Sequence, residues 1–130
     1  MDSQVTVKAV ILNPDNKALI MNEKGRWQAP GGRTESGERL REGLVREVYE
    51  ETGIEDLEIG AAIHVDEWFA TPEDKHVHIV AIFYECRTKT TDIKLEPIEH
   101  EDFAWVGLDD LPNYVIEPEM KKAIEIVLGK

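Results

Sequence analysis

The sequence predicts an α/β (α+β) domain in which a mixed β-sheet lies between two helices. Three observations support this class: apolar residues alternate along several short segments, a helical period begins after Ser36 and stops at Gly53, and a second helical period closes the chain. The 130 residues, 42% of them hydrophobic, are enough for one core. No linker, repeat or low-complexity tract divides them, so we expect a single domain over residues 1–130.

The first quarter of the chain is predicted to be extended. Its apolar residues first alternate and then run together, which is typical of a strand that becomes buried on both faces. The predicted elements are, in order, a strand over Val5–Leu12, a turn at Asn13–Asn16, a strand over Ala18–Met21, a turn around Lys24-Gly25 and an extended piece over Arg26–Ala29. Pro30 helps to keep this extended piece out of helix, and we expect Pro30-Gly31-Gly32 to be a loop.

The next segment has the apolar spacing of a helix. Leu44 and Val48 lie on one stripe, and the pattern predicts a helix over Gly37–Thr52. Ser36 can serve as its N-cap, and Gly53 is placed to stop it.

Two long strands and a second helix are predicted downstream. The predicted elements are strands over Leu57–Phe69 and Val77–Cys86 paired as a hairpin, a connecting turn at Thr71–Asp74, an irregular segment over Thr88–Glu99, a strand over Phe103–Val106 and a helical turn at Leu108–Pro112. A last helix starts at Pro118, where Met120, Ala123, Ile124 and Val127 recur at helical spacing. Its apolar stripe is predicted to be core.

Composition excludes several classes of partner. The formal net charge of −12 disfavours a nucleic-acid duplex, whose affinity comes mainly from Lys and Arg contacts. A small anionic substrate remains compatible, since a bound cation can reverse the local charge of an acidic cleft. No apolar run approaches the roughly 20 residues that span a bilayer. With Cys86 as its single cysteine and no signal-peptide pattern at its start, the chain is expected to be cytoplasmic.

Three carboxylates in the first predicted helix indicate a metal site. Glu47, Glu50 and Glu51 are spaced i, i+3, i+4, so they project from one face of the helix. A solvated helix face is the alternative, but steps of 100° place Glu51 at the edge of the apolar stripe. Carboxylates held together at the rim of a core need a cation, and oxygen ligands favour Mg²⁺, with Mn²⁺ as an alternative. The carbonyls of the Pro30-Gly31-Gly32 loop can add ligands, and its N–H groups can meet phosphate.

These residues belong to a longer pattern that resembles the Nudix box without a departure. Read in order with their spacing, its positions are Gly32, five residues, Glu38, seven residues, Arg46-Glu47-Val48, one residue, Glu50-Glu51, one residue and Gly53-Ile54. The preceding Trp27–Gly31 also looks like the usual lead-in of this family. The resemblance, closest to its small MutT-like members, implies a Nudix-type α/β/α sandwich and hydrolysis of a diphosphate bond.

The resemblance also implies a role for each position. The implied metal ligands are the carboxylates of Glu47, Glu50 and Glu51 and the carbonyl of Gly31. Arg46 would hold a carboxylate by ion pairing, and Glu38 would support the site from outside it. Gly31 and Gly32 would form the phosphate loop.

The general base is expected to be Glu47, which would accept a proton from a metal-bound water. Some family members use a glutamate from a late loop, for which Glu99 and Glu101 are the candidates here. Solvated loop charge is the alternative for both of these residues.

The substrate is predicted less directly, because the box binds diphosphate and the rest of the fold selects the remaining group. Phe69 stands where ADP-ribose pyrophosphatases tend to have proline, with Pro72 slightly beyond, and no tyrosine typical of dinucleoside polyphosphate hydrolases is present nearby. The length of the chain, together with Leu95-Glu96-Pro97 placed before Phe103-Ala104-Trp105, looks more like the MutT-type enzymes. We therefore expect a nucleoside triphosphate or modified deoxynucleoside triphosphate to be split into monophosphate and pyrophosphate.

Alternatives to this substrate are ADP-ribose or a nucleotide sugar, and a non-catalytic domain that only binds nucleotide. A nucleoside site needs aromatic and hydrogen-bonding groups, and no residue is assigned to it. The available side chains are Trp68, Phe69, His76, His78 and Phe83. The expected assembly is a monomer or a homodimer.

Overall fold

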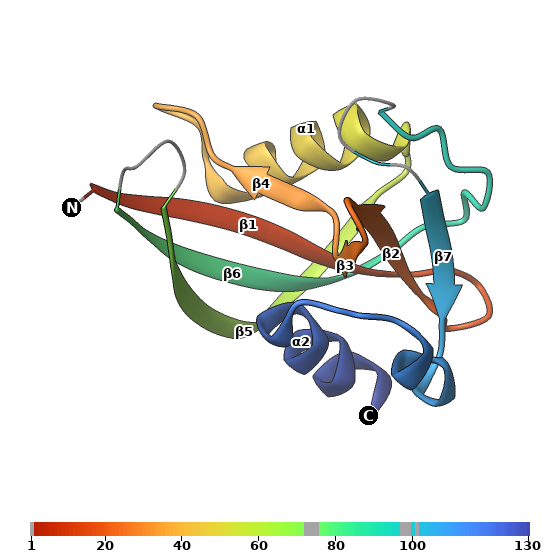
Figure 1. Cartoon of the computed structure of the whole chain (residues 1–130). Coiled ribbons are helices and arrows are strands. Elements are labelled where there is room, and N and C mark those ends of the chain that lie inside the picture. The colour runs from red at the N-terminus through yellow and green to blue at the C-terminus, as the bar shows by residue number, and fades with distance from the viewer. Residues whose placement is uncertain (1, 72–75, 97–99, 101) are drawn as a thin grey trace.

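The computed structural model has the predicted class: a mixed sheet with α1 (Leu40–Thr52) on one face and α2 (Pro118–Leu128) on the other (Figure 1). It describes residues 2–71, 76–96, 100 and 102–130. Within these ranges, no helix has the length and apolar character needed to cross a membrane.

Seven strands form one sheet. They are β1 (Asp2–Leu12), β2 (Ala18–Glu23), β3 (Arg26–Gln28), β4 (Gly31–Arg33), β5 (Glu58–Ala70), β6 (Val77–Arg87) and β7 (Asp102–Val106). The order is β3-β2-β1-β6-β5, with β4 also paired to β1 and β7 to β2. Strands β5 and β6 are antiparallel, which confirms the predicted hairpin pairing, whereas β1 and β6 run parallel. A 3₁₀ helix η2 (Leu108–Asn113) follows β7 and matches the predicted helical turn.

Strand β1 is the centre of the fold because its side chains alternate between two cores. Val7 and Ile11 pack with Leu44 of α1 on one face. Val10 packs with Ile124 of α2 on the other face. Each such side chain stabilises the fold by about 1.5–3 kcal/mol through burial. The prediction that this strand is buried on both faces is therefore confirmed.

The first helix begins later than predicted, and Ser36 is not its N-cap. Ser36 and Gly37 form a turn, and Gly37 has a φ of +81°, which no right-handed helix contains. The helix starts at Leu40, with Arg39 at the N-cap position. The Arg39 backbone N–H donates to the Glu42 carboxylate (3.0 Å), which satisfies a group at the helix start. The predicted stop at Gly53 is confirmed by a left-handed φ of +75°.

The predicted loop at Pro30-Gly31-Gly32 is also corrected, because Gly31 and Gly32 begin β4 and pair with Lys8 and Val7 of β1. The pairing is so close that a Cβ on Gly31 would lie 2.1 Å from the Val7 carbonyl oxygen, and Gly31 has a φ of +138°. Only glycine fits there. This contact places the start of the box directly against the central strand.

Two sequence predictions concern segments between these elements. Most of the predicted turn at Thr71–Asp74 lies outside the described residues. Residues 88–96, the described part of the predicted irregular segment, form neither helix nor strand. This segment lies against the end of α1, where the Lys94 and Glu96 backbone N–H groups donate to the carbonyls of Thr52 and Glu51 (2.9 and 3.2 Å).

Candidate active site

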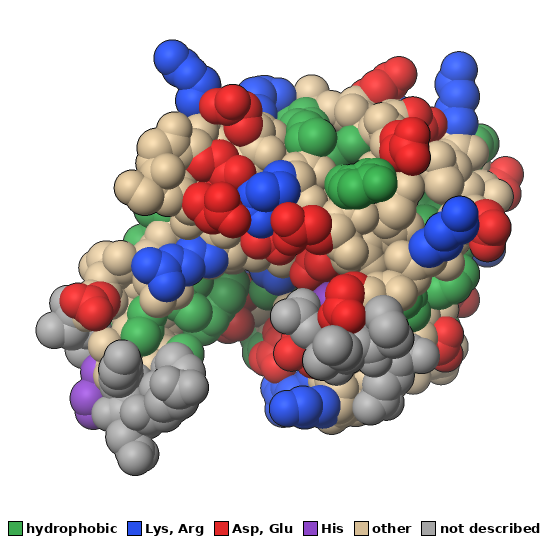
Figure 2. Space-filling model, turned by 90° about the horizontal axis from the view of Figure 1, so that it is seen from above, with side chains coloured by type: hydrophobic (Ala, Val, Ile, Leu, Met, Phe, Trp, Pro, Cys, Tyr) green, Lys and Arg blue, Asp and Glu red, His purple; other side chains and the backbone are tan. Residues whose placement is uncertain are grey.

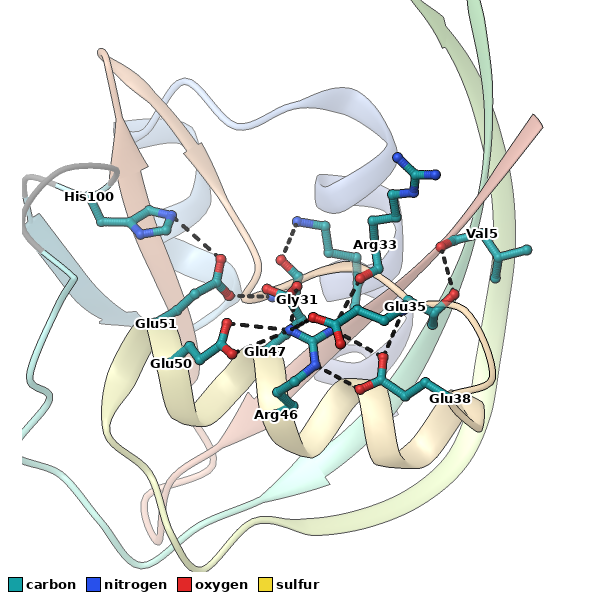
Figure 3. Close-up of polar contacts among 12 residues, drawn as sticks. Val5, Gly31, Arg33, Glu35, Glu38, Arg46, Glu47, Glu50, Glu51 and His100 are labelled. Atoms are coloured by element: carbon teal, nitrogen blue, oxygen red, sulfur yellow. Dashed lines mark hydrogen bonds and ion pairs between the residues drawn. The ribbon is translucent and has the colours of Figure 1, made fainter. Parts of the chain in front are cut away.

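The three carboxylates of α1 lie beside β4, where the helix faces the sheet (Figure 3). Glu51 and Glu47 are largely buried, with side-chain exposures of 10% and 18%, whereas Glu50 is 56% exposed. A solvated helix face would leave all three exposed, so burial supports the interpretation of Glu51 and Glu47 as site residues. Figure 2 shows acidic and basic side chains interspersed on this face of the molecule, with a hollow in the surface beside them.

Glu51 is oriented by groups from two distant parts of the chain. Its Oε1 accepts a hydrogen bond from the Gly31 backbone N–H (2.8 Å). Its Oε2 lies 3.9 Å from Nε2 of His100, a side chain that is only 3% exposed. His100 was missed by the sequence analysis, since it stands alone in a polar segment with no motif spacing around it. Figure 3 shows both partners converging on Glu51.

Arg46 is the cation among these carboxylates. It binds Glu38 through two bonds, Nε to Oε2 (2.7 Å) and Nη2 to Oε1 (3.0 Å). Its Nη1 also lies 3.2 Å from Glu47 Oε1 and 3.3 Å from Glu50 Oε2. The hydrogen bonds from Arg46 lower the pKa of Glu38 to about 2, and those to Glu38 raise the pKa of Arg46. Such a two-bond pair fixes the guanidinium, so Arg46 is held where it can orient the neighbouring carboxylates.

Glu47 lies directly against Gly32. A Cβ on Gly32 would be 2.7 Å from both Cδ and Oε2 of Glu47, which is closer than non-bonded atoms approach. Burial raises the pKa of Glu47, opposed by its hydrogen bond and ion pair with Arg46. Gly32 therefore provides the space that the Glu47 carboxylate occupies.

Lys8 is a second residue that the sequence analysis missed. It lies on β1 and is 6% exposed, and its Nζ donates to the backbone carbonyls of Ala29 (3.2 Å) and Gly31 (3.5 Å) and to Gln28 Oε1 (3.2 Å). Burial lowers the pKa of Lys8, while the Glu51 charge opposes this shift most strongly. A lysine inside an otherwise apolar strand is rare unless it is paired, and this signal is visible in the sequence.

The donor atoms fit a hard divalent cation by chemistry, since carboxylate and carbonyl oxygens are the ligands that Mg²⁺ prefers. In the described part of the chain, however, no three His, Cys, Asp or Glu side chains converge as a metal site. Glu47 and Glu50 are turned toward Arg46, and Glu51 toward Gly31. Arg46 contacts Oε1 of Glu47 and both carboxylate oxygens of Glu50. The metal-ligand set therefore stays a prediction.

A pocket of about 420 Å³ opens between β3, β5 and the start of α2. It is lined by Gln28, Trp68, Phe69, Glu117, Pro118, Glu119 and Met120. This volume lies within the range of roughly 300–1,000 Å³ that is typical of ligand sites. Gln28 connects it to the carboxylates, since Lys8 contacts both Gln28 and Gly31.

The aromatic and histidine candidates for the nucleoside site lie in different parts of the structure. Trp68 and Phe69 line the pocket just described. Phe83 is 0% exposed and belongs to the core on the α2 face. His78 contacts Glu67 and stacks on Phe69, with ring centroids 4.8 Å apart, and His76 is exposed. The late-loop candidates Glu99 and Glu101 lie outside the described residues.

Known proteins resemble this chain in sequence and in fold. The NUDIX domain model matches residues 2–126. The chain is 31% identical over 125 residues to MutT4 of Mycobacterium tuberculosis, covering 96% of this chain but 47% of that relative, so it spans about half the relative's length. It is 30% identical over 108 residues to the nucleoside triphosphatase NudI of Escherichia coli, covering 78% of this chain and 76% of NudI.

A solved structure agrees with these sequence relatives. The MutT protein of Methanosarcina mazei superimposes with a TM-score of 0.83 at 25% identity, covering 97% of this chain and 93% of that one. The family model spans nearly the whole chain, and the NudI relative covers more than two thirds of both proteins. The chain therefore belongs to the NUDIX family and is a Nudix hydrolase.

Proposed function

We propose that this hydrolase splits nucleoside triphosphates, including modified deoxynucleoside triphosphates, into monophosphate and pyrophosphate in the presence of Mg²⁺, with Mn²⁺ as a substitute. One observation carries the proposal: a continuous set of contacts joins a pocket to the carboxylate cluster. Gln28 lines the pocket and accepts from Lys8, Lys8 donates to Gly31, and Gly31 donates to Glu51. A nucleoside in the pocket would leave its phosphates beside these carboxylates.

The chemistry follows from the residues at that end. A divalent ion held by Glu47, Glu50, Glu51 and the Gly31 carbonyl would neutralise phosphate charge and lower the pKa of a bound water. Glu47 is the proposed base, because it is partly buried and its Oε1 is held by Arg46 (3.2 Å). Arg46 is itself fixed by Glu38, so it would orient this carboxylate while a proton is accepted.

Relatives support the triphosphate as substrate. NudI is named a nucleoside triphosphatase, and the M. mazei structure is a MutT protein. The pocket adds a physical reason: Trp68 offers aromatic surface for a base, and Gln28 offers a polar group in the same pocket. ADP-ribose, nucleotide sugars and binding without cleavage are the alternative outcomes of the experiment below.

The experiment compares wild type with Glu51→Gln on a panel of triphosphates, oxidised triphosphates, ADP-ribose and nucleotide sugars. Glu51→Gln is expected to lower turnover at least about 100-fold with Mg²⁺, because it removes a charged ligand that groups on both sides hold in place. Glu125→Gln, at an exposed position on α2, is the matched control and should keep full turnover. Equal turnover by wild type and Glu51→Gln would contradict the site. A higher kcat/KM for ADP-ribose than for every triphosphate would contradict the substrate.

A further inference from the structure

The side-chain amide of Gln28 is held at both of its ends. Its Oε1 accepts from Lys8 Nζ (3.2 Å), and its Nε2 donates to the Glu23 carboxylate. An amide can rotate by half a turn and exchange its oxygen with its nitrogen, so its orientation depends on its partners. Only one orientation of the Gln28 amide forms both hydrogen bonds, because the Lys8 ammonium group only donates and the Glu23 carboxylate only accepts. Lys8 and Glu23 therefore fix which end of the amide is the acceptor.

Gln28 also lines the pocket. With one hydrogen bond made at each end, Gln28 keeps one N–H donor and one oxygen lone pair for a ligand. Of the other polar pocket residues, Glu117 is paired with Arg26 (Nη2 to Oε2, 3.1 Å). A base that lies against Trp68 would meet in Gln28 a donor and an acceptor in one defined order.

We propose that Lys8 and Glu23 are positioning residues for base selection: they hold Gln28 so that the pocket accepts bases with one order of hydrogen-bond donor and acceptor and rejects the reverse order. This inference rests on the proposed function for the presence of a nucleoside in the pocket. The ligand class is a nucleobase edge with a donor beside an acceptor. A base of the wrong order would leave buried polar groups unpaired, which costs about tenfold or more in affinity.

Two pairs of nucleotides isolate this effect, because their members have nearly the same shape and opposite polarity. Adenine has an amino donor beside a ring acceptor, whereas hypoxanthine has an oxo acceptor beside a ring donor, and cytosine and uracil differ in the same way. The quantity to measure is the kcat/KM ratio of ATP to ITP and of CTP to UTP. Damage to the metal site affects both members of a pair equally and cancels in the ratio. Wild type is expected to discriminate at least about tenfold within a pair.

Lys8→Met keeps an unbranched side chain that is one atom shorter and removes its hydrogen-bond donors, so the Gln28 amide can turn. In Lys8→Met, the kcat/KM ratio within each nucleotide pair is expected to fall toward one. Gln28→Leu should lose the same discrimination. In the Gln28→Leu background, Lys8→Met should change the ratio no further, because Lys8 acts through Gln28. A merely structural role for Lys8 would lower both rates and leave the ratio of wild type. Glu23→Gln replaces the carboxylate acceptor with an amide that can also donate. We expect the kcat/KM ratio to fall less in this variant than in Lys8→Met.

Lys17→Met, at an exposed position between β1 and β2, is the control for losing a lysine and should keep the wild-type ratio. Circular dichroism establishes that each variant is folded. If Lys8→Met does not fold, Glu23→Gln and Gln28→Leu decide the matter. A wild-type ratio near one, or an unchanged ratio in the folded variants, would overturn the inference.

Binding separates this inference from the proposed function. The affinities of AMP and IMP, followed without metal by the intrinsic tryptophan fluorescence to which Trp68 in the pocket contributes, should show the same discrimination and the same loss in Lys8→Met. If wild type cleaved no triphosphate but still distinguished AMP from IMP through Gln28, the proposed reaction would fail and the inference would stand. If triphosphates were cleaved with no base discrimination, the proposed reaction would stand and the inference about Lys8 and Glu23 would fail.

Discussion

Replacing Gly32 by alanine should damage catalysis while leaving the fold nearly intact. The added Cβ would lie 2.7 Å from Cδ and Oε2 of Glu47, about 1 Å inside the usual contact distance of roughly 3.5–4.0 Å. The carboxylate is the free end of a side chain, so it can move by about that distance at little cost. A misplacement of about 1 Å in an active site lowers turnover about 100-fold. We therefore expect kcat to fall about 100-fold and the free energy of unfolding to change by less than about 1 kcal/mol.

Gly31→Ala should show the opposite signature. Its Cβ would lie 2.1 Å from the Val7 carbonyl oxygen and 2.8 Å from Lys8 Cα, and these backbone atoms cannot turn away. The φ of +138° adds strain of its own. A loss of about 3 kcal/mol or more in the free energy of unfolding is expected. Gly25→Ala is a control away from the site, since its φ is +87° with no atom within 4 Å of the added Cβ.

The assay pairs urea unfolding with the release of pyrophosphate from the best triphosphate at saturating Mg²⁺. Gly25→Ala should lose about 1 kcal/mol of stability and keep wild-type turnover. Wild-type turnover in Gly32→Ala would refute the reasoning that Glu47 needs the space above this glycine. A loss of stability as large as that of Gly31→Ala would refute it as well, since the contact would then not be absorbed by the side chain.

Three further predictions test other features of the fold. Glu38 has a folded pKa near 2, below its ordinary value of 4.5, so its pairing with Arg46 stabilises the fold above about pH 4.5 and is lost as the pH falls toward 2. In urea titrations, the stability difference between wild type and Glu38→Gln should thus be constant above about pH 5 and shrink below it. A difference that grew on acidification would contradict this sign. Burial raises the pKa of the Cys86 thiol to about 12, so a thiol reagent at pH 8 should label the native protein only as fast as it unfolds. Ile124→Ala should cost about 2–5 kcal/mol in unfolding free energy, because Ile124 is 0% exposed between α2 and the sheet. Glu125→Ala, the exposed control beside it, should stay within about 0.5 kcal/mol.

The carboxylate cluster could be predicted from the sequence because it is local. Glu47, Glu50 and Glu51 share one helix, whose geometry places residues three and four apart side by side. The helix itself was recognisable from its apolar period, and Gly53 marked its end. Its start was predicted wrongly, because a serine N-cap signal at Ser36 competes with the left-handed backbone that Gly37 adopts.

Tertiary structure alone decided which distant groups meet these carboxylates. Lys8 reaches Gly31 through the pairing of β1 with β4. His100 lies far from Gly31 in the sequence and belongs to no helix or strand, yet it reaches Glu51. Strand pairing is set by long-range packing, and the period of a strand does not say which strand will lie beside it.

The pocket likewise could not be predicted from the sequence, because its residues come from distant parts of the chain. Gln28 and Trp68 were both visible as residues, yet only the fold brings β3, β5 and the start of α2 around one space. The sequence by itself indicated a Nudix hydrolase, because the box that carries the resemblance lies in one continuous stretch of the chain, from Gly32 to Ile54. The pocket proposed for the nucleoside is assembled from three separated segments, so it became visible only in the folded chain.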